Sequence, residues 1–295
     1  MPVLTFPTCR ACRNVSQCCN LSPHHGRLLK CQTAAMQIVG VLAQDPALLE
    51  AVTRFRDPLG RFHLHPINGG DTAGALAGLA PLEFAGALLL GPRYMEDAWR
   101  AVTRRSVSAQ EARAVDTVTV AGGQLIGEYS AGRALTTMLA EAGWDGRGAR
   151  AVLLGAGDAP RAIARELTSL GLAQLTVVAQ DRPAAEQTLP APLARTRLIA
   201  TTAGDSHLPN YLASADLIVR EARVVDIPYS LLGPHLCVID LLDGHDDGLL
   251  DRAAAAAAPT FSSLHYRAHL LALGLSQILG AKIQQDQLYS LLQEA

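Results

Sequence analysis

The amino-acid sequence predicts an α/β fold in two domains. Short apolar runs of strand length alternate with segments of helical periodicity along most of the chain, which is typical of sheets covered by helices. The chain has 295 residues, of which 49% are hydrophobic and 18% charged, a length that suits one large or two medium-sized domains. A strand, a glycine turn, a helix and a second strand follow one another over residues 151–182.

The first domain is expected over residues 36–140. Its strands are predicted at 38–42, 62–67 and 87–90, and its helices at 46–55, from a cap at Asp71 to Leu79, and at 96–104. Segments 114–120 and 124–127 flank Ala121-Gly122-Gly123, which predicts a β-hairpin because glycine accepts the positive φ angles of a tight turn. A long helix over 130–142, rich in Ala and Leu, then leads into the second domain.

The second domain, expected over residues 141–260, opens with a dinucleotide-binding pattern. Residues 152–154 form an apolar run without helical spacing, as expected of a buried parallel strand, and Gly155 and Gly157 permit a sharp turn after it. The following helix ends at Gly171, where a C-terminal glycine is favoured. Asp181 follows Gly157 by 24 residues, near the spacing of a ribose-binding acid. These features predict a Rossmann-like, NAD(P)-binding domain.

Asp158 departs from this pattern. A carboxylate in a loop whose backbone N–H groups face a pyrophosphate repels the phosphate charge. We expect Asp158 to N-cap the helix, which opens with Pro160 near its first position. The predicted cofactor-binding residues are Gly155, Ala156, Gly157, Ala159, Arg161, Asp181 and Arg182.

The α/β alternation continues to the end of the chain. Further strands are predicted at 175–178, 199–201, 217–219 and 236–241, and helices at 208–214, 249–257 and 264–279. Segment 261–295 is expected to pack its helices back on the junction between the two domains.

The charge of the chain argues against several classes of partner. A net charge of −2 provides no basic field for nucleic acid and no polybasic membrane patch, and no apolar run is long enough to span a bilayer. We expect a cytoplasmic protein whose partners include neither nucleic acid nor a membrane. A homo-oligomer is compatible with the sequence.

Residues 1–35 differ from the rest of the chain. They hold five of the six cysteines, with His24 and His25 nearby; these cysteines are Cys9, Cys12, Cys18, Cys19 and Cys31. The spacing fits no standard zinc finger, so we predict no metal site. A clean strand begins at Met36, and residues 1–35 are expected to be a disordered leader or an extension upstream of the true start.

From Met36 to the C-terminus the chain resembles the shikimate dehydrogenase family. Gly-Ala-Gly-Asp-Ala-Pro-Arg-Ala at 155–162 matches the family's Gly-Ala-Gly-Gly-Ala-x-Arg-Ala turn, and Ala-Val-Asp-Thr-Val at 114–118 is similar to its Ala-Val-Asn-Thr-Val. The helix at 264–280 has the length and place of the family's C-terminal helix. The resemblance implies a substrate domain and a nucleotide domain separated by a cleft, with NADP as the family's cofactor.

The positions that carry the family's chemistry differ in this chain. The family's proton-handling Lys falls at Tyr94, and the Asp of its Asn-Thr-Asp-Gly segment falls at Ala131. Such general acid–base groups typically contribute about 10²- to 10⁴-fold in rate. The family's C-terminal Gln falls at Leu270, and its Ser-x-Ser pair has no counterpart over 45–51. We therefore favour a pseudoenzyme that keeps the fold, with a nucleotide-binding, structural or regulatory role.

The alternative is an active NAD(P)-dependent oxidoreductase that acts on a different small hydroxy or keto substrate. Tyr94 would then donate a proton, and Asp116 stands where the resemblance places a substrate-contacting Asn; both also fit structural roles. For the cofactor, Arg182 would favour NADP and Asp181 would favour NAD, while both also fit ordinary loop charges.

The histidines and serines of the C-terminal region indicate no further chemistry. His265 and His269 lie one helical turn apart, but no carboxylate is spaced with them as a helical metal site requires. Ser262 and Ser263 have no base partner that the sequence identifies.

Overall fold

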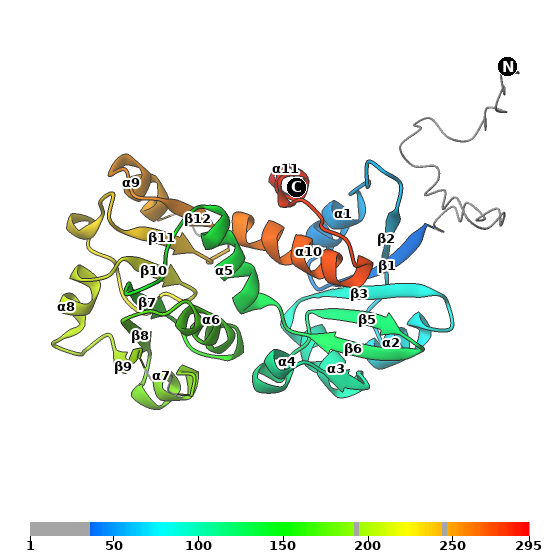
Figure 1. The fold of residues 1–295 in the computed structure, drawn as a ribbon, viewed down its shortest axis with the longest axis horizontal. Helices are drawn as coiled ribbons and strands as arrows, with labels where there is room; N and C mark the ends of the chain where they lie inside the picture. The colour runs from blue at the N-terminus through cyan, green and yellow to red at the C-terminus, as the bar shows by residue number, and fades with distance from the viewer. Residues whose placement is uncertain (1–35, 192–194, 244–246, 295) are drawn as a thin grey trace, which may run out of the picture. The chain divides into compact units, whose positions relative to one another are not determined.

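The computed structural model describes residues 36–191, 195–243 and 247–294, so the expectations for residues 1–35 lie outside the described residues. Residues 37–295 form one compact unit that contains two six-stranded sheets with helices around them (Figure 1). The predicted α/β fold class is confirmed.

The first sheet has the strand order β2-β1-β3-β5-β6-β4. Its strands are β1 (Gln37–Ala43), β2 (Phe62–Pro66), β3 (Phe84–Leu90), β4 (Arg104–Arg105), β5 (Thr117–Ala121) and β6 (Gln124–Glu128). β1 pairs in parallel with β2 and β3, whereas β5 is antiparallel to both β3 and β6. The helices of this half are α1 (Pro46–Thr53), α2 (Thr72–Leu79), α3 (Pro92–Ala101) and α4 (Val107–Ala112).

The predicted hairpin is confirmed as a two-residue turn between β5 and β6. Ala121 pairs with Gln124, and the two residues between them, Gly122 and Gly123, have φ angles of 56° and 76°. Two consecutive positive φ angles define the turn type that matches the twist of a hairpin, and glycine adopts them without strain. The turn thereby sets the register that places the residues before β5 and after β6 beside one another.

Two details of this half differ from expectation. Helix α3 begins at Pro92, not at residue 96, because Pro92 occupies its first turn, where a fixed φ and a missing N–H do not disturb the helix. Strand β4 and helix α4 were absent from the predicted elements. Ser106 caps α4 by accepting a hydrogen bond from the backbone N–H of Ala109 at 3.2 Å.

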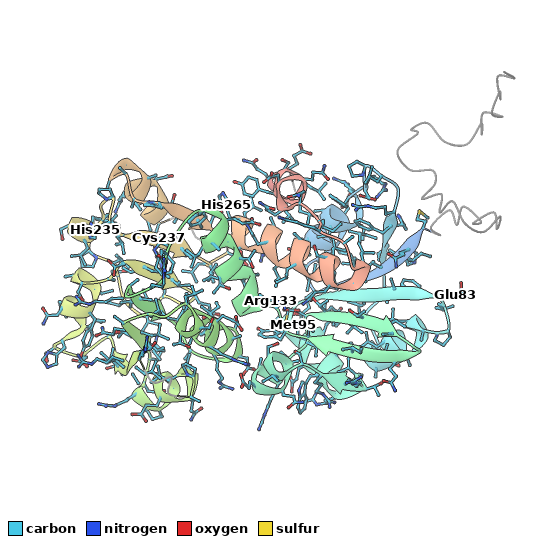
Figure 2. The ribbon with its side chains drawn as sticks, in the orientation of Figure 1. Glu83, Met95, Arg133, His235, Cys237 and His265 are labelled. Atoms are coloured by element: carbon cyan, nitrogen blue, oxygen red, sulfur yellow. The ribbon has the colours of Figure 1, made fainter. Side chains whose placement is uncertain are left out.

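The second sheet is entirely parallel, with the order β12-β11-β10-β7-β8-β9. Its strands are β7 (Arg150–Leu154), β8 (Gln174–Ala179), β9 (Arg197–Thr202), β10 (Leu217–Arg220), β11 (Cys237–Asp240) and β12 (Thr260–Ser262). Around it lie α5 (Ala131–Glu141), α6 (Asp158–Ser169), α7 (Arg182–Thr188), α8 (Leu208–Ala213), a 3-10 turn η2 (Tyr229–Leu231) and α9 (Leu249–Ala255). Cys237 lies buried on β11 (Figure 2).

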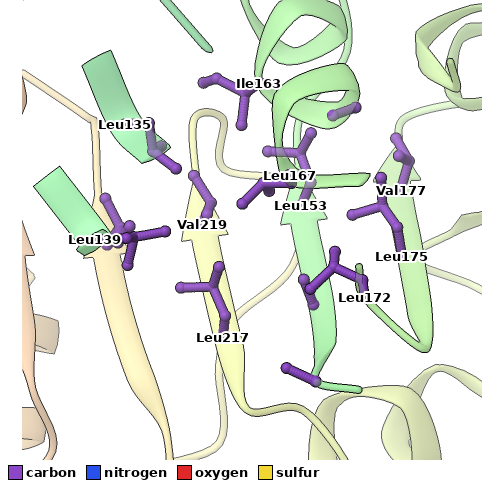
Figure 3. Close-up of a cluster of buried hydrophobic side chains, with 14 of the residues drawn as sticks. Leu135, Leu139, Leu153, Ile163, Leu167, Leu172, Leu175, Val177, Leu217 and Val219 are labelled. Carbon is purple, nitrogen blue, oxygen red and sulfur yellow. The ribbon is translucent and has the colours of Figure 1, made fainter. Parts of the chain in front are cut away.

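One core of the second sheet packs between its strands and helices α5 and α6. Figure 3 shows Leu153 on β7 and Val219 on β10 facing Leu135 from α5 and Leu167 from α6, and all four side chains are buried. Burying a side chain of this size contributes about 1.5–3 kcal/mol. This packing holds α6, and with it the glycine turn before α6, against the carboxyl ends of β7 and β10.

The start of α6 corrects the expectation for Asp158. Gly157 is the N-cap and makes no side-chain cap bond, so Asp158 is the first helical residue and not the cap. Its carboxylate lies 3.5 Å from the Arg161 guanidinium, three residues further along the helix. Gly157 reaches the cap position with a φ of 126°, a value that glycine alone adopts readily.

Helix α10 (Ser263–Leu279) lies against elements of both sheets. It packs on β3 and β5 of the first sheet and on α5 and β12 of the second, and α11 (Gln285–Gln293) packs on it in turn (Figure 1). Within the described part of the chain, no helix is long and apolar enough to cross a bilayer. The C-terminal helices thus bring residues 263–271 beside the ends of β3 and β11.

Candidate functional site

The glycine turn between β7 and α6 has a backbone that only glycine suits. Gly155 has a φ of 142°, and a Cβ added to it would lie 2.6 Å from the Glu221 Oε2. The carboxylate of Glu221 therefore lies directly against the turn. A Rossmann-like sheet binds its ligand in this crevice, outside the carboxyl ends of the strands.

Glu221 follows the last residue of β10, and its backbone N–H donates to the carbonyl of Leu154 at 2.9 Å. Burial raises the pKa of the Glu221 carboxyl to about 7, and no cation offsets this effect. The carboxyl is thus poised to gain or lose its proton near neutral pH. The sequence prediction missed Glu221, although its place immediately after a buried parallel strand is a signal that could have found it.

Other groups of the turn are already engaged. The backbone N–H of Gly157 donates to the Thr188 Oγ1 at 3.3 Å, and the Arg161 Nε donates to the Gln187 carbonyl at 3.0 Å. Ala156 and Ala159 are half-buried, and Ala159 lines the pocket described below. A diphosphate here would meet Asp158 and Glu221 before any unpaired cation.

Asp181 and Arg182 belong to the first turn of α7, an element that was not predicted. Asp181 is the N-cap and accepts from the backbone N–H of Ala184 at 2.8 Å. The Arg182 Nε lies 3.0 Å from the Glu186 Oε1 on the exposed face of the same helix. Both side chains stand at the end of β8, where a Rossmann fold reads the ribose, and both already have local partners.

A pocket of about 350 Å³ lies among β3, α3, α5, α6 and α10. Its lining is mainly apolar and includes Leu48, Leu90, Met95, Leu241, Leu270 and Leu271. Its polar lining includes Gln44, Asp45, Asp116, Tyr129, Asp243, Tyr266 and Arg267. Arg267 forms an ion pair with Asp243, which offsets the charge of the guanidinium.

Asp116, predicted as a candidate, does line this pocket. Its side chain is only 3% exposed and accepts hydrogen bonds from the backbone N–H of Ser130 at 2.6 Å and from the Thr117 hydroxyl at 2.9 Å. Burial raises its pKa to about 6 despite these two hydrogen bonds, which act in the opposite direction. The hairpin places Asp116 here, because β5 begins and β6 ends at this edge.

Two tyrosines that sequence reasoning missed also line the pocket. The Tyr266 hydroxyl donates to the Ala131 carbonyl at 3.2 Å. Tyr129 is 7% exposed. Among the described residues its hydroxyl has no hydrogen-bond partner, and the hydroxyl is not sealed from solvent. Burial, followed by the charges of Asp116, Asp158 and Glu221, raises the pKa of Tyr129, which places its hydroxyl among these carboxylates.

Tyr94, the other predicted candidate, does not line this pocket. Its ring lies over Gly69, where an added Cβ would come within 2.5 Å of the ring carbons. Met95, the next residue, lines the pocket in its place (Figure 2). The helical geometry of α3 explains the difference, since successive residues point about 100° apart around a helix axis.

Within the part of the chain that the structure describes, no amine lines the pocket. Lys282 is the one lysine among the described residues. Its ammonium lies 4.0 Å from the Glu141 carboxylate, and 72% of the Lys282 side chain is exposed. Ala131, which stands where the family carries its Asp, is buried in the first turn of α5 and lines the pocket with a methyl group. Among the described residues, the pocket lining thus includes no lysine, and position 131 carries no carboxylate.

The C-terminal histidines and serines have partners that the sequence did not identify. The Ser262 hydroxyl lies 2.9 Å from the His265 Nδ1, a contact that the sequence did not identify. The contact belongs to a capping box at the start of α10. The His269 Nε2 lies 3.1 Å from Glu141 on α5. Within the described residues no cluster of three or more metal-ligating side chains occurs.

The turn has the backbone shape of a dinucleotide site but not its charge. Positive φ angles at Gly155 and Gly157 and a helix behind them suit a pyrophosphate. The ionised carboxylates of Asp158 and Glu221 do not, because like charges at this range repel. At a pH where Glu221 is ionised, these residues do not fit a dinucleotide phosphate.

No protein-family model matches the chain. Shikimate dehydrogenase (NADP(+)) of Moorella thermoacetica is 35% identical over 157 residues, which cover 52% of this chain and 52% of that protein. The chain thus matches about half the length of the first of its curated relatives.

Two solved structures are similar over most of the chain. Shikimate 5-dehydrogenase from Listeria monocytogenes, in complex with shikimate and NAD, has a TM-score of 0.73 at 18% identity and covers 88% of this chain and 97% of its own. The ligand-free 5-ketofructose reductase of Gluconobacter sp. strain CHM43 has a TM-score of 0.71 at 22% identity, with coverages of 88% and 98%. These two likenesses show that the fold is shared.

Proposed function

Given that this chain belongs to the shikimate dehydrogenase family, we propose that it does not oxidise shikimate and that its cleft binds a small, largely apolar molecule. The family assignment fits the two sheets and the Rossmann-like arrangement of the second. The loss of the reaction and the class of ligand are the parts proposed.

The observation that carries the proposal is the lining of the pocket beside the glycine turn. Oxidation of a hydroxyl needs a group that takes its proton, and the family's pair for this step is a Lys and an Asp. Here Tyr94 packs over Gly69, Ala131 offers a methyl group, and the amine of Lys282 lies outside the pocket. The proton-transfer pair is therefore missing on both sides.

The apolar lining of the pocket also argues against shikimate as its ligand. Leu90, Met95 and Leu270 line the pocket, and none of them can hydrogen-bond a hydroxyl. Each ring hydroxyl buried without a partner would cost about 1–3 kcal/mol. The carboxylate of shikimate would also lie near the Asp116 carboxyl, and Arg267, which belongs to the pocket lining, already pairs with Asp243.

A turnover assay tests the first part of the proposal. Purified protein is incubated with shikimate and either NADP or NAD, and reduced nicotinamide is followed by absorbance at pH 7 to 10. We expect no rate above that of a buffer control. Turnover at an ordinary enzymatic rate would overturn the proposal.

A thermal-shift comparison tests the second part. Cyclohexanecarboxamide, a neutral ring without hydroxyls, is compared with shikimate at equal concentration. We expect the amide to raise the melting temperature and shikimate to leave it unchanged. The variant Leu270→Gln supplies a polar partner in the pocket and is expected to weaken the effect of the amide. A shift by shikimate alone would contradict the proposed class of ligand.

A second candidate function rests on Asp116. A pocket-lining carboxyl with a pKa raised to about 6 is ionised at neutral pH and is basic enough to accept a proton, and the Tyr129 hydroxyl beside it is unpaired within the described part of the chain. These groups favour an oxidoreductase acting on a different small hydroxy or keto substrate. Any turnover found in a substrate screen should then fall by about 10²-fold or more in Asp116→Asn.

A further inference from the structure

We propose that Glu221 makes the glycine turn selective against phosphate-bearing ligands, so that the cleft accepts a neutral or cationic molecule and admits a dinucleotide only when Glu221 is protonated. The inference deepens the proposed function by naming the charge class of the ligand. It rests on the proposed function only in assuming that a ligand binds in the cleft.

The position of Glu221 is the first step. Its Oε2 occupies the space immediately beside Gly155, within 2.6 Å of where a Cβ would stand. A Rossmann-like fold brings the ligand's phosphates to this turn and to the N-terminus of the following helix. The carboxylate thus takes the place of the anion that the turn would otherwise hold.

The cations near the turn do not neutralise this carboxylate. Arg161 is occupied by Asp158 and the Gln187 carbonyl. Arg220, the residue before Glu221, turns into the core and binds Asp240 and Asp247. The turn is therefore flanked by two carboxylates, those of Asp158 and Glu221, and the guanidinium groups of Arg161 and Arg220 are bound to other partners.

Tyr129 supplies an independent indication that a ligand binds here. Its side chain is more than nine-tenths buried and lines the pocket, and its hydroxyl has no partner among the residues that the structure describes. Because this hydroxyl is not fully sealed from solvent, it remains accessible to a polar group of a ligand in the pocket. A ligand that carries a neutral or cationic donor would satisfy Tyr129 and the nearby carboxylates together.

Burial raises the pKa of Glu221, and several titratable groups share its surroundings. Tyr129, before α5, and Tyr266, on α10, face it with hydroxyls whose pKa values are raised, so both stay neutral. Asp158 on α6 and Asp116 before β5 contribute negative charge, and Arg223 in the following loop pairs with Asp247 at 2.8 Å. Protonation of Glu221 therefore removes one of the two charges at the turn.

Calorimetric titration with NADP, without shikimate, tests the proposal. Wild type, Glu221→Gln and the control Glu83→Gln are compared at pH 8 and pH 6. Glu83 is an exposed residue before β3, at the opposite end of that strand from Leu90 (Figure 2), so its replacement removes the same charge away from the cleft.

At pH 8 we expect Glu221→Gln to bind NADP at least tenfold more tightly than wild type, with Glu83→Gln equal to wild type. At pH 6 wild type should approach Glu221→Gln. Equal affinities of wild type and Glu221→Gln at pH 8 would overturn the proposal, and so would no binding by any variant at either pH. Glu221→Ala provides a second charge removal if Glu221→Gln does not fold. Because this readout needs no turnover, shikimate oxidation would refute the proposed function without deciding the role of Glu221.

Discussion

The substitution Arg220→Met should destabilise the second sheet strongly. Arg220 ends β10 with 3% of its surface exposed, and its Nε lies 3.0 Å from the Asp240 Oδ1 and its Nη1 2.5 Å from the Asp247 Oδ2. Asp240 ends β11 and is 6% exposed. Removing the guanidinium leaves the Asp240 carboxylate buried without a cation, whereas Asp247 keeps Arg223.

Breaking a buried pair in this way costs about 3–5 kcal/mol. Urea unfolding at pH 7, followed by circular dichroism, gives the free energy of unfolding. The control is Arg54→Met, which removes an ion pair with Glu50 whose side chains are 63% and 66% exposed and which should cost less than about 1 kcal/mol. The double variant Arg220→Met/Asp240→Leu should recover part of the loss, because it also removes the unpaired charge.

The reasoning would be refuted if Arg220→Met cost no more than Arg54→Met. The Arg220 guanidinium also holds the pKa of Asp247 well below its usual range. A depressed carboxyl pKa stabilises the fold above the unfolded value of 3.8, and that stabilisation is lost as the pH falls toward the folded value. Wild type should therefore lose this contribution in acid, and Arg220→Met should lose less.

Three further predictions concern the cleft. Gly155→Ala should cost about 1–3 kcal/mol in urea unfolding from its backbone angle, and more than Gly157→Ala, because only the former brings a Cβ against Glu221; equal losses would contradict the contact. Burial raises the pKa of Asp116 from 3.8 to about 6, so wild type should lose stability as the pH rises from about 4 to about 6. The difference in unfolding free energy between Asp116→Asn and wild type should therefore grow across that range of pH. A constant difference would argue against the raised pKa. Tyr94→Phe should leave ligand binding and any turnover unchanged, whereas Tyr129→Phe should weaken ligand binding in the thermal-shift assay.

Local patterns were enough to predict most of the strands and helices. Gly122 and Gly123 specify a hairpin turn through their allowed φ angles, and the apolar run before Gly155 predicts a buried strand because both faces of a parallel sheet are covered. The missed elements are short. Helices α4 and α7 and strand β12 have too few residues for their periodicity to stand out, and packing supplies their stability.

The candidate site, like the fold, could be predicted from the sequence only in part. Asp116 could be identified as a candidate because it lies in a recognisable segment, and Ala131 and Leu270 could be recognised as departures from a family pattern. Tyr94 could not be placed by alignment alone, because its register on α3 decides that Met95, and not Tyr94, faces the pocket. Asp158 was expected to cap α6, but Gly157 takes that position because its backbone reaches angles closed to Asp.

By itself the sequence determined the fold class and the glycine turn, because these depend on residue type and local spacing, whereas the loss of the family's Lys and Asp stays a prediction. The tertiary structure alone decided what surrounds the turn and the pocket. Glu221 lies 66 residues after Gly155, and Tyr266 lies 135 residues after Ala131, yet each pair is in contact. Such neighbours are set by the pairing of β7 with β10 and by the packing of α10 on α5, which no local pattern specifies.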